Sequence, residues 1–313
     1  MASKPKILGI VGPTASGKSN LAVILAKKYG GEVISADSRQ VYRGMNVGTG
    51  KITKKEMRSV PHHLLDVALP KKIYTVSDYV QDAERAFRGI LRRGNLPIIC
   101  GGTGFYISAL VDKLQLPDVP PNSSLRKRLT KKSTGELFKQ LKRLDPRFAS
   151  RIDRNNPHRL IRAIEIARAL GSVPPLRVKT PYDPLFIGIN ISKEKLAKRI
   201  RKRLLARMKK GMPNEVSGLL RGGMSLRRME ELGLEYRFCS RYVKGKITKD
   251  QLLAQCETAI KQYAKRQMTW FKKDKRIHWV GQDVKKTKRL VENFLRKSPR
   301  VSAWAVVLSG SAV

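Results

Sequence analysis

The chain has 313 residues, of which 41% are hydrophobic, enough to bury one large α/β domain or a core with a smaller inserted domain. This composition argues against global disorder. The formal net charge is +42, from 66 Lys and Arg against 24 Asp and Glu. Such an excess favours a polyanionic partner, above all a nucleic acid, although a generally basic proteome would produce it too. The three cysteines lie far apart, which argues against a disulfide framework and a CxxC zinc site.

The sequence shows no segment that would cross a membrane. No long apolar run follows the first residues, and the apolar stretch at 301–308 is too short to span a bilayer. We therefore expect a cytoplasmic protein with no membrane partner.

Short apolar runs alternate with helical periodicity along the first 112 residues. Strands are predicted at 6–11, 32–35 and 96–100, and helices at 19–29 and 77–93. This alternation is typical of a parallel sheet with helices on both faces, whose ligands bind at the carboxyl ends of the strands.

The pattern changes after Asp112. Two proline-rich stretches, 116–124 and 173–184, enclose a densely basic region, 125–170, in which all patterns are helical. Further strands are predicted at 186–191 and 276–280, and further helices at 193–208, 226–243, 248–273 and 285–296. We expect a discontinuous core at 1–112 and 184–298, an inserted all-helical domain at 113–183, and a tail of unknown role at 299–313.

The segment GPTASGKS, which begins at residue 12, fits the P-loop pattern GxxxxGK[ST] between a strand and a helix. This match predicts that the α/β core has a P-loop NTPase-like fold. The backbone of such a loop cradles phosphates, Lys18 would neutralise them, and the Ser19 hydroxyl would ligate Mg²⁺, the expected cofactor. The pattern alone leaves open whether these phosphates belong to a nucleotide such as ATP or to another diphosphate. The candidate diphosphate-binding residues are Gly12, Pro13, Thr14, Ala15, Ser16, Gly17, Lys18 and Ser19.

Two further segments lie where a P-loop protein carries its chemistry. Asp37 follows the second strand, where a carboxylate would hold magnesium, act as a general base, or simply cap a helix. The third strand leads directly into GGTGFY, without the acidic residue that nucleotide hydrolysis requires. This turn, which contains Thr103, therefore favours group transfer, although it also suits a tight strand-to-helix connection.

Two other groups of residues leave their roles open. His62 and His63 are adjacent, so their side chains diverge, and a structural or substrate-positioning role is favoured over a metal site. The segment KRQMTWFKK, residues 265–273, ends a basic helix with Trp270 and Phe271. These aromatic side chains would either stack on bases or face the core.

Seven segments together resemble the tRNA dimethylallyltransferase (IPP transferase) family in order and spacing. They are GPTASGKS, SADSRQVY, RGMNVGTGK, PHHLLD, GGTGFY, NPHRLIRAIEI and AKRQMTWF, and the resemblance extends over roughly residues 6 to 280. It implies a P-loop that binds dimethylallyl diphosphate and a helical insertion that binds the anticodon stem-loop of tRNA. The implied reaction transfers the dimethylallyl group to the 6-amino group of the adenosine 3′ of the anticodon and releases diphosphate.

The resemblance also implies roles for individual residues. Asp37 would be the general base, Thr103 would assist it, and Lys18 and Arg203 would stabilise the leaving diphosphate. The implied tRNA contacts are Asp37, Ser38, Arg39, Gln40, Thr103, His158, Arg159, Leu160, Ile161 and Arg162. The sequence departs from the family at LGLEYR, residues 232–237, where relatives carry a Gly-Tyr-Lys-Glu type of segment, and no zinc finger follows the core.

The residues leave three other functions open. An adenylate prenyltransferase would use a free nucleotide as acceptor, a P-loop kinase would hold ATP in the loop, and a basic RNA-binding protein would have no catalysis. The intact Lys18, Ser19 and Asp37 argue against pure binding, and the GGTGFY turn argues against the kinase. We expect a monomer that binds tRNA and dimethylallyl diphosphate.

Overall fold

The computed structural model describes residues 4–176, 178–281 and 283–296. The tail predicted at 299–313 lies outside the described residues. The chain forms two compact units, one from Met1–Lys113 with Thr180–Val313 and one from Leu114–Lys179. Among the described residues, no helix combines the length and apolar character needed to cross a bilayer.

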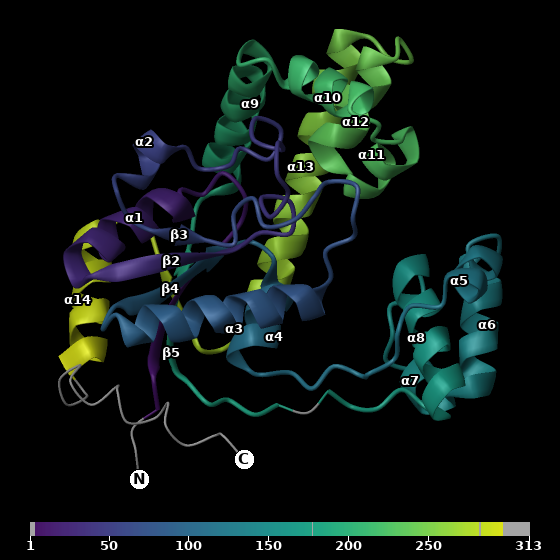
Figure 1. The fold of residues 1–313 in the computed structure, drawn as a ribbon, viewed down its shortest axis with the longest axis horizontal. Coiled ribbons are helices and arrows are strands. Elements are labelled where there is room, and N and C mark those ends of the chain that lie inside the picture. Colours follow the sequence, from purple (N-terminus) through teal and green to yellow (C-terminus); the bar gives the residue numbers. More distant parts are fainter. Residues whose placement is uncertain (1–3, 177, 282, 297–313) are drawn as a thin grey trace. The chain divides into compact units, whose positions relative to one another are not determined.

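The first unit is built on a six-stranded parallel sheet in the order β3-β2-β4-β1-β5-β6 (Figure 1). The four inner strands are β1 (Lys6–Val11), β2 (Gly31–Ala36), β4 (Leu96–Gly101) and β5 (Asp183–Ile189), and the outer strands are β3 (His62–His63) and β6 (Ile277–Val280). All residues of β1 and β2 are buried, as expected for inner strands of a parallel sheet that is covered on both faces. The predicted α/β class is confirmed.

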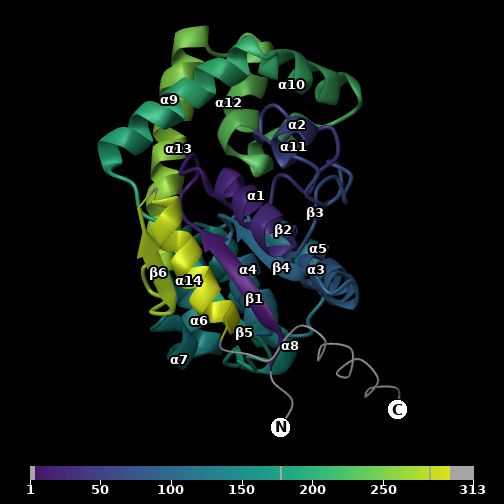
Figure 2. The ribbon, with the colours of Figure 1, turned by 90° about the vertical axis from the view of Figure 1, so that its left-hand side faces the viewer.

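Helices cover both faces of this sheet (Figures 1 and 2). Helices α1 (Lys18–Tyr29) and α14 (Val284–Arg296) pack on one face, and α3 (Val76–Arg92) and α4 (Gly104–Val111) pack on the other. A short helix, α2 (Lys54–Met57), lies in the connection between β2 and β3. The sheet is therefore buried on both sides, and its strand ends remain for ligands.

Five further helices of this unit form a bundle with its own core (Figure 1). They are α9 (Lys193–Lys209), α10 (Met212–Arg221), α11 (Leu226–Leu232), α12 (Leu234–Val243) and α13 (Lys249–Phe271). The single helix predicted at 226–243 is wrong, because Gly233 adopts φ 70° and ψ −169° and separates α11 from α12. Val41, Tyr42 and Met45, from the loop after β2, pack into this core and join the bundle to the sheet.

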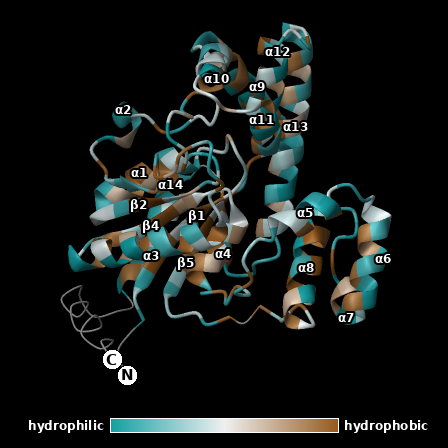
Figure 3. Cartoon of the chain, turned by 45° about the vertical axis from the view of Figure 1, so that its right-hand side comes forward, coloured by the Kyte–Doolittle hydropathy of each residue, from teal (hydrophilic) through white to brown (hydrophobic). Residues whose placement is uncertain are grey.

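The second unit contains only helices, as its sequence predicts. They are α5 (Ser123–Leu129), α6 (Thr134–Leu144), α7 (Pro146–Ala149) and α8 (Pro157–Leu170). Leu137 and Leu141 of α6 pack with Leu160 and Ile164 of α8 in its core, and most charged residues remain on the outside, the buried Asp145 and Glu165 excepted (Figure 3). This short core orders the unit while leaving its basic side chains in solvent.

Candidate active site

The P-loop connects β1 to α1 and has the backbone geometry needed to surround an anion. Gly12 and Gly17 have φ of 142° and 102°, values that a side chain would strain. Gly17 caps α1 without any side-chain hydrogen bond, so the first amides of this helix are free to bind a ligand. The local sequence thus builds a phosphate site at the carboxyl end of β1.

Lys18 and Ser19 occupy the first turn of α1. The Lys18 side chain is partly buried, and its Nζ donates a 2.6 Å hydrogen bond to the carbonyl of Pro13. Burial lowers the pKa of Lys18 to about 8. A bound anion would supply negative charge beside this ammonium, and the exposed Ser19, whose hydroxyl hydrogen-bonds to the Cys100 thiol, lies next to it.

Asp37 lies just beyond the end of β2 and is oriented by its own turn. Its Oδ1 accepts hydrogen bonds from the amides of Arg39 (2.8 Å) and Gln40 (3.2 Å), which leaves Oδ2 without a partner in the described part of the chain. Thr103, just beyond β4, accepts a 3.1 Å hydrogen bond from the amide of Ser38. The structure therefore brings the predicted residues of both turns together and leaves one carboxylate oxygen of Asp37 available, while the Thr103 hydroxyl also hydrogen-bonds to Tyr263.

Gln267 of α13 joins the P-loop to the turn after β4. It is 6% exposed, accepts from the Thr14 amide at 2.8 Å and donates to the Gly102 carbonyl at 2.9 Å. A Cβ at Gly102 would lie 2.0 Å from the Gln267 amide nitrogen, so this position must be glycine for the bridge to form. Gln267 belongs to the AKRQMTWF segment, but nothing in the sequence indicates this contact.

Two adjoining cavities open on Asp37. The first, the P-loop cavity, has a volume of about 310 Å³ and is lined by Lys18, Ser19, Asp37 and Arg203, among others. The second, the Arg39 cavity, measures about 450 Å³, and its cationic lining includes Arg39, Arg237 and Arg266. The residues that line both are Thr14, Asp37, Thr49, Arg207 and Tyr263. Asp37 therefore stands where a ligand of one cavity would meet a ligand of the other.

Helix α9 supplies cations to the P-loop cavity. Arg199 donates a 3.1 Å hydrogen bond to the Ser16 carbonyl, and Arg203 follows one turn later on the same face. Arg207, another turn on, pairs with Glu235 and donates to the Gly48 carbonyl at 3.1 Å. Arg203, which the resemblance implies as a diphosphate ligand, thus lies on the cavity wall, whereas Arg207 was not expected there.

A carboxylate of α10 holds the loop that carries Thr49. The Glu215 carboxylate accepts from the amides of residues 46, 47 and 48 at 2.6 to 2.9 Å, and from the Tyr236 hydroxyl at 2.8 Å. A Cβ at Gly50 would lie 2.1 Å from the Arg207 guanidinium, which explains the glycine in the GTGK segment. Glu235 and Tyr236 come from LGLEYR, so the segment that departs from the family pattern makes definite contacts here.

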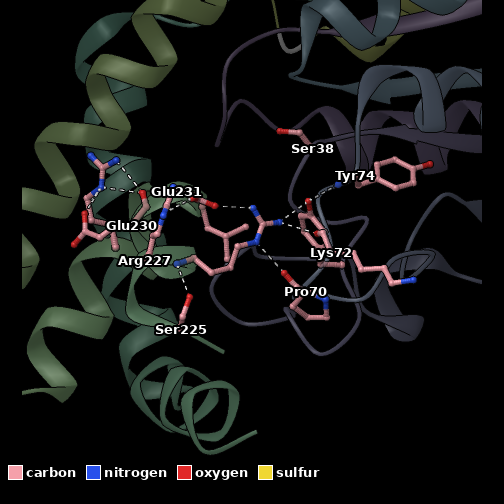
Figure 4. Close-up of polar contacts among 12 residues, drawn as sticks. Ser38, Pro70, Lys72, Tyr74, Ser225, Arg227, Glu230 and Glu231 are labelled. Atoms are coloured by element: carbon pink, nitrogen blue, oxygen red, sulfur yellow. Dashed lines mark hydrogen bonds and ion pairs between the residues drawn. The ribbon is translucent and has the colours of Figure 1, made fainter. Parts of the chain in front are cut away.

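Arg228 of α11 holds the loop that carries Pro70 and Lys72, both of which are labelled in Figure 4. Its guanidinium donates to the carbonyls of Pro70 (3.0 Å) and Lys72 (2.9 Å) and to the Tyr42 hydroxyl (2.9 Å). Arg39 donates through Nε to the carbonyl of Leu232, at the end of the same helix (2.8 Å). These contacts hold both ends of the Arg39–Tyr42 segment and so support Asp37, which precedes it.

The two adjacent histidines have different surroundings, as their divergence predicts. His62 lines the P-loop cavity, and its Nδ1 lies 2.8 Å from the Val60 carbonyl oxygen. His63 Nε2 lies 2.6 Å from Oε2 of the buried Glu32, which also binds Arg93. His63 is therefore structural, and the described residues contain no cluster of His, Cys, Asp or Glu suited to a metal.

The predicted tRNA contacts of α8 lie in three different surroundings. His158 and Arg159 are exposed at the first turn of the helix. Leu160 and Ile161 are 0% and 6% exposed and face the core of the second unit. Arg162 pairs with the buried Glu165 and donates to the Val119 carbonyl at 2.9 Å. His158 and Arg159 are thus the side chains of this group that are free to meet a ligand.

Comparisons with known proteins agree with this geometry. The sequence pattern of the IPP transferase family matches residues 40–274. A tRNA dimethylallyltransferase of Geotalea uraniireducens is 41% identical over 281 residues, which cover 88% of this chain and 93% of that protein. One from Porphyromonas gingivalis is 44% identical over 282 residues, with the same coverage of 88% and 93%.

Solved structures show the same fold. The tRNA isopentenylpyrophosphate transferase of Bacillus halodurans superposes with a TM-score of 0.71 at 33% identity, covering 96% of this chain and 98% of that one. A eukaryotic dimethylallyltransferase acting on tRNA has a TM-score of 0.76 at 23% identity, covering 95% and 81%. With its P-loop, the Asp37 turn and these similarities over most of its length, the chain belongs to the IPP transferase family.

Proposed function

We propose that this protein is a tRNA dimethylallyltransferase. It transfers a dimethylallyl group from dimethylallyl diphosphate to the 6-amino group of the adenosine 3′ of the anticodon, and releases diphosphate. The observation that carries this proposal is the position of Asp37 between a P-loop cavity and an arginine-lined cavity. The P-loop cavity suits a diphosphate, and the Arg39 cavity suits a nucleotide within a nucleic acid. Asp37 lies between the places where the two reacting groups would bind.

The P-loop cavity holds the donor. The loop amides and Lys18 bind the diphosphate, and Arg203 faces it from α9. As the bond between the allylic carbon and oxygen breaks, negative charge grows on the diphosphate, and these oriented donors stabilise it. Ser19 would hold Mg²⁺ together with diphosphate oxygens and water, a ligand set that this ion prefers. When bound, Mg²⁺ supplies further positive charge at the leaving group.

The Arg39 cavity holds the acceptor base. The 6-amino nitrogen attacks the allylic carbon, and its proton passes to the free Oδ2 of Asp37. The Thr103 hydroxyl accepts from the Ser38 amide and also hydrogen-bonds to Tyr263, so it would assist by positioning the groups around the acceptor base. Burial, and to a smaller extent the negative charge of Asp37, raises the pKa of Tyr263 to about 12. This phenol therefore stays protonated beside the reacting groups.

The low pKa of Lys18 makes donor binding dependent on pH. The free protein loses the Lys18 proton near pH 8, whereas the bound diphosphate raises that pKa, so binding above pH 8 takes up a proton. We expect affinity for dimethylallyl diphosphate to be greatest below pH 8 and to fall by up to about tenfold per pH unit above it. Calorimetric titration from pH 7 to 10 measures this. Lys18→Met, which keeps the length of the side chain, should bind weakly and without the fall. A fall of equal slope in Lys18→Met would assign the titration to another group.

The helical unit supports the choice of tRNA as acceptor. We propose that residues 113–183 form a tRNA-binding domain inserted in a catalytic core of 1–112 and 184–298, and that the protein acts as a monomer. The unit carries many exposed basic residues, which suit the line of phosphates of a stem-loop and exceed what free adenylate would need.

Removing Arg159 should weaken tRNA binding without affecting the donor. Each neutralised phosphate contributes about −0.7 to −0.9 to the log–log salt slope, so Arg159→Ala should flatten that slope by about that amount. Arg162 is unsuitable for this test because its loss would leave Glu165 buried and short of a partner. Arg289→Ala is the matched control, since Arg289 is exposed on α14 of the core. If both substitutions flatten the salt slope equally, Arg159 acts only through the overall positive charge of the protein and makes no specific contact with tRNA.

A thermal-protection experiment tests the donor. Dimethylallyl diphosphate with Mg²⁺ should raise the melting temperature more than ATP with Mg²⁺ at equal concentration, because tighter ligands stabilise the native state more. Stronger protection by ATP would favour the P-loop kinase. The turn after β4 argues against that outcome, since Gly101 and Gly102 stand where a kinase would need a carboxylate.

A further inference from the structure

Two adjacent aromatic residues near the end of α13 lie in different surroundings. Phe271 is 3% exposed and packs in the core beneath the sheet, whereas Trp270 is 38% exposed. Phe271 therefore faces the core, whereas Trp270 is exposed and could stack on a base. Single exposed apolar side chains are common on proteins, so the surroundings of Trp270 decide whether it has a role.

Trp270 is held against the catalytic turn. Its indole lies directly on the backbone of Gly104, where a Cβ would be 2.1 Å from Cδ1. The Phe105 ring meets it edge-on, with centroids 6.3 Å apart and planes at 79°. Gly104 immediately follows Thr103, so the indole is oriented beside the proposed acceptor site before any ligand binds.

Trp270 also continues a row of flat side chains along α13. Tyr263, Arg266 and Trp270 are spaced by three and four residues, which places them on one face of the helix. Tyr263 and Arg266 line the Arg39 cavity, and the Arg266 guanidinium lies 5.8 Å from the centre of the Tyr263 ring. Trp270 follows Arg266 by about 6 Å along the axis, a distance that suits the next base of an RNA strand.

We infer that this face of α13, formed by Tyr263, Arg266 and Trp270, is a stacking surface for unpaired RNA, on which the Trp270 indole binds the base next to the acceptor adenosine. A base that turns out of its stack leaves a neighbour with one uncovered face, and an aromatic or guanidinium plane replaces the lost stacking. Exposed Lys265, Lys272 and Lys273 supply positive charge for the phosphates of the same strand. This inference rests on the proposed function, because it requires an RNA acceptor.

The test is the affinity of anticodon stem-loop RNA for wild type, Trp270→Ala and Trp270→Phe. Loss of one stacked base weakens binding by about 10- to 100-fold, so we expect that loss in Trp270→Ala and near-wild-type affinity in Trp270→Phe. Leu226→Ala, which truncates another exposed apolar side chain at 39% exposure, should have no effect. Affinity for dimethylallyl diphosphate should be unchanged in all variants, which shows that the fold is intact.

A second RNA separates stacking from a general change in the surface. An abasic nucleotide is placed on the 5′ or the 3′ side of the acceptor, and each RNA is titrated into wild type and Trp270→Ala. At the stacked position the abasic RNA should bind both proteins equally, since either change removes the same contact. Additive losses at both positions would overturn the inference. Failure of wild type to bind or modify any RNA would instead contradict the proposed function, so the two failures are distinguishable.

Discussion

Lys18→Ala should lower the rate of prenyl transfer by about 10²- to 10³-fold and weaken diphosphate binding. Lys18 supplies an oriented cation on the wall of the P-loop cavity, at the point where the leaving group gains charge. Because burial has already lowered its pKa, the ammonium is poorly solvated, and a bound anion gains more from it than from a lysine in water. Single-turnover transfer to tRNA with saturating donor measures the loss.

The control is Lys27→Ala, which removes the same charge from the exposed side of α1. It should retain the wild-type rate. A rate for Lys18→Ala within about tenfold of wild type would show that Lys18 of the P-loop does not stabilise the leaving diphosphate.

Asp37→Asn should lower the single-turnover rate by about 10²-fold or more, with little change in tRNA affinity. The asparagine side-chain oxygen can still accept from the Arg39 and Gln40 amides, so the turn is retained. Only the capacity of Oδ2 to take a proton is lost. The substitution therefore separates proton transfer from the positioning of the loop.

Asp250→Asn is a suitable comparison, because Asp250 is an exposed carboxylate in the first turn of α13, outside the two cavities. It should keep most of the activity. If Asp37→Asn loses tRNA binding while bound substrate reacts at the normal rate, Asp37 positions the RNA and is not the base.

The local parts of the site were predictable from the sequence. The P-loop depends on glycines and a lysine within eight residues, and the Asp37 and Thr103 turns follow apolar runs that mark their strands. Strand β3 was missed because it consists only of His62 and His63 and has no apolar run. Helix α10 was missed because Pro213 and Gly218 interrupt its helical pattern.

Other parts depend on packing between distant segments. Gln267 and Arg207 reach the cavities only because α13 and α9 pack in the bundle beside the sheet. Leu160 and Ile161 follow two exposed basic residues in the sequence, yet the helical period turns their side chains into the core. In these cases a motif marked the right segment, and the fold decided which of its side chains are free.

A competition between two acceptors tests whether the acceptor is an adenosine of tRNA. The protein should be incubated with dimethylallyl diphosphate, Mg²⁺, unmodified tRNA and AMP together, and both the digested tRNA and the free nucleotides analysed by mass spectrometry. We expect dimethylallyl adenosine in the tRNA, at the position 3′ of the anticodon, and little or no prenylated AMP. Prenylated AMP in the absence of modified tRNA would contradict it and would identify an adenylate prenyltransferase.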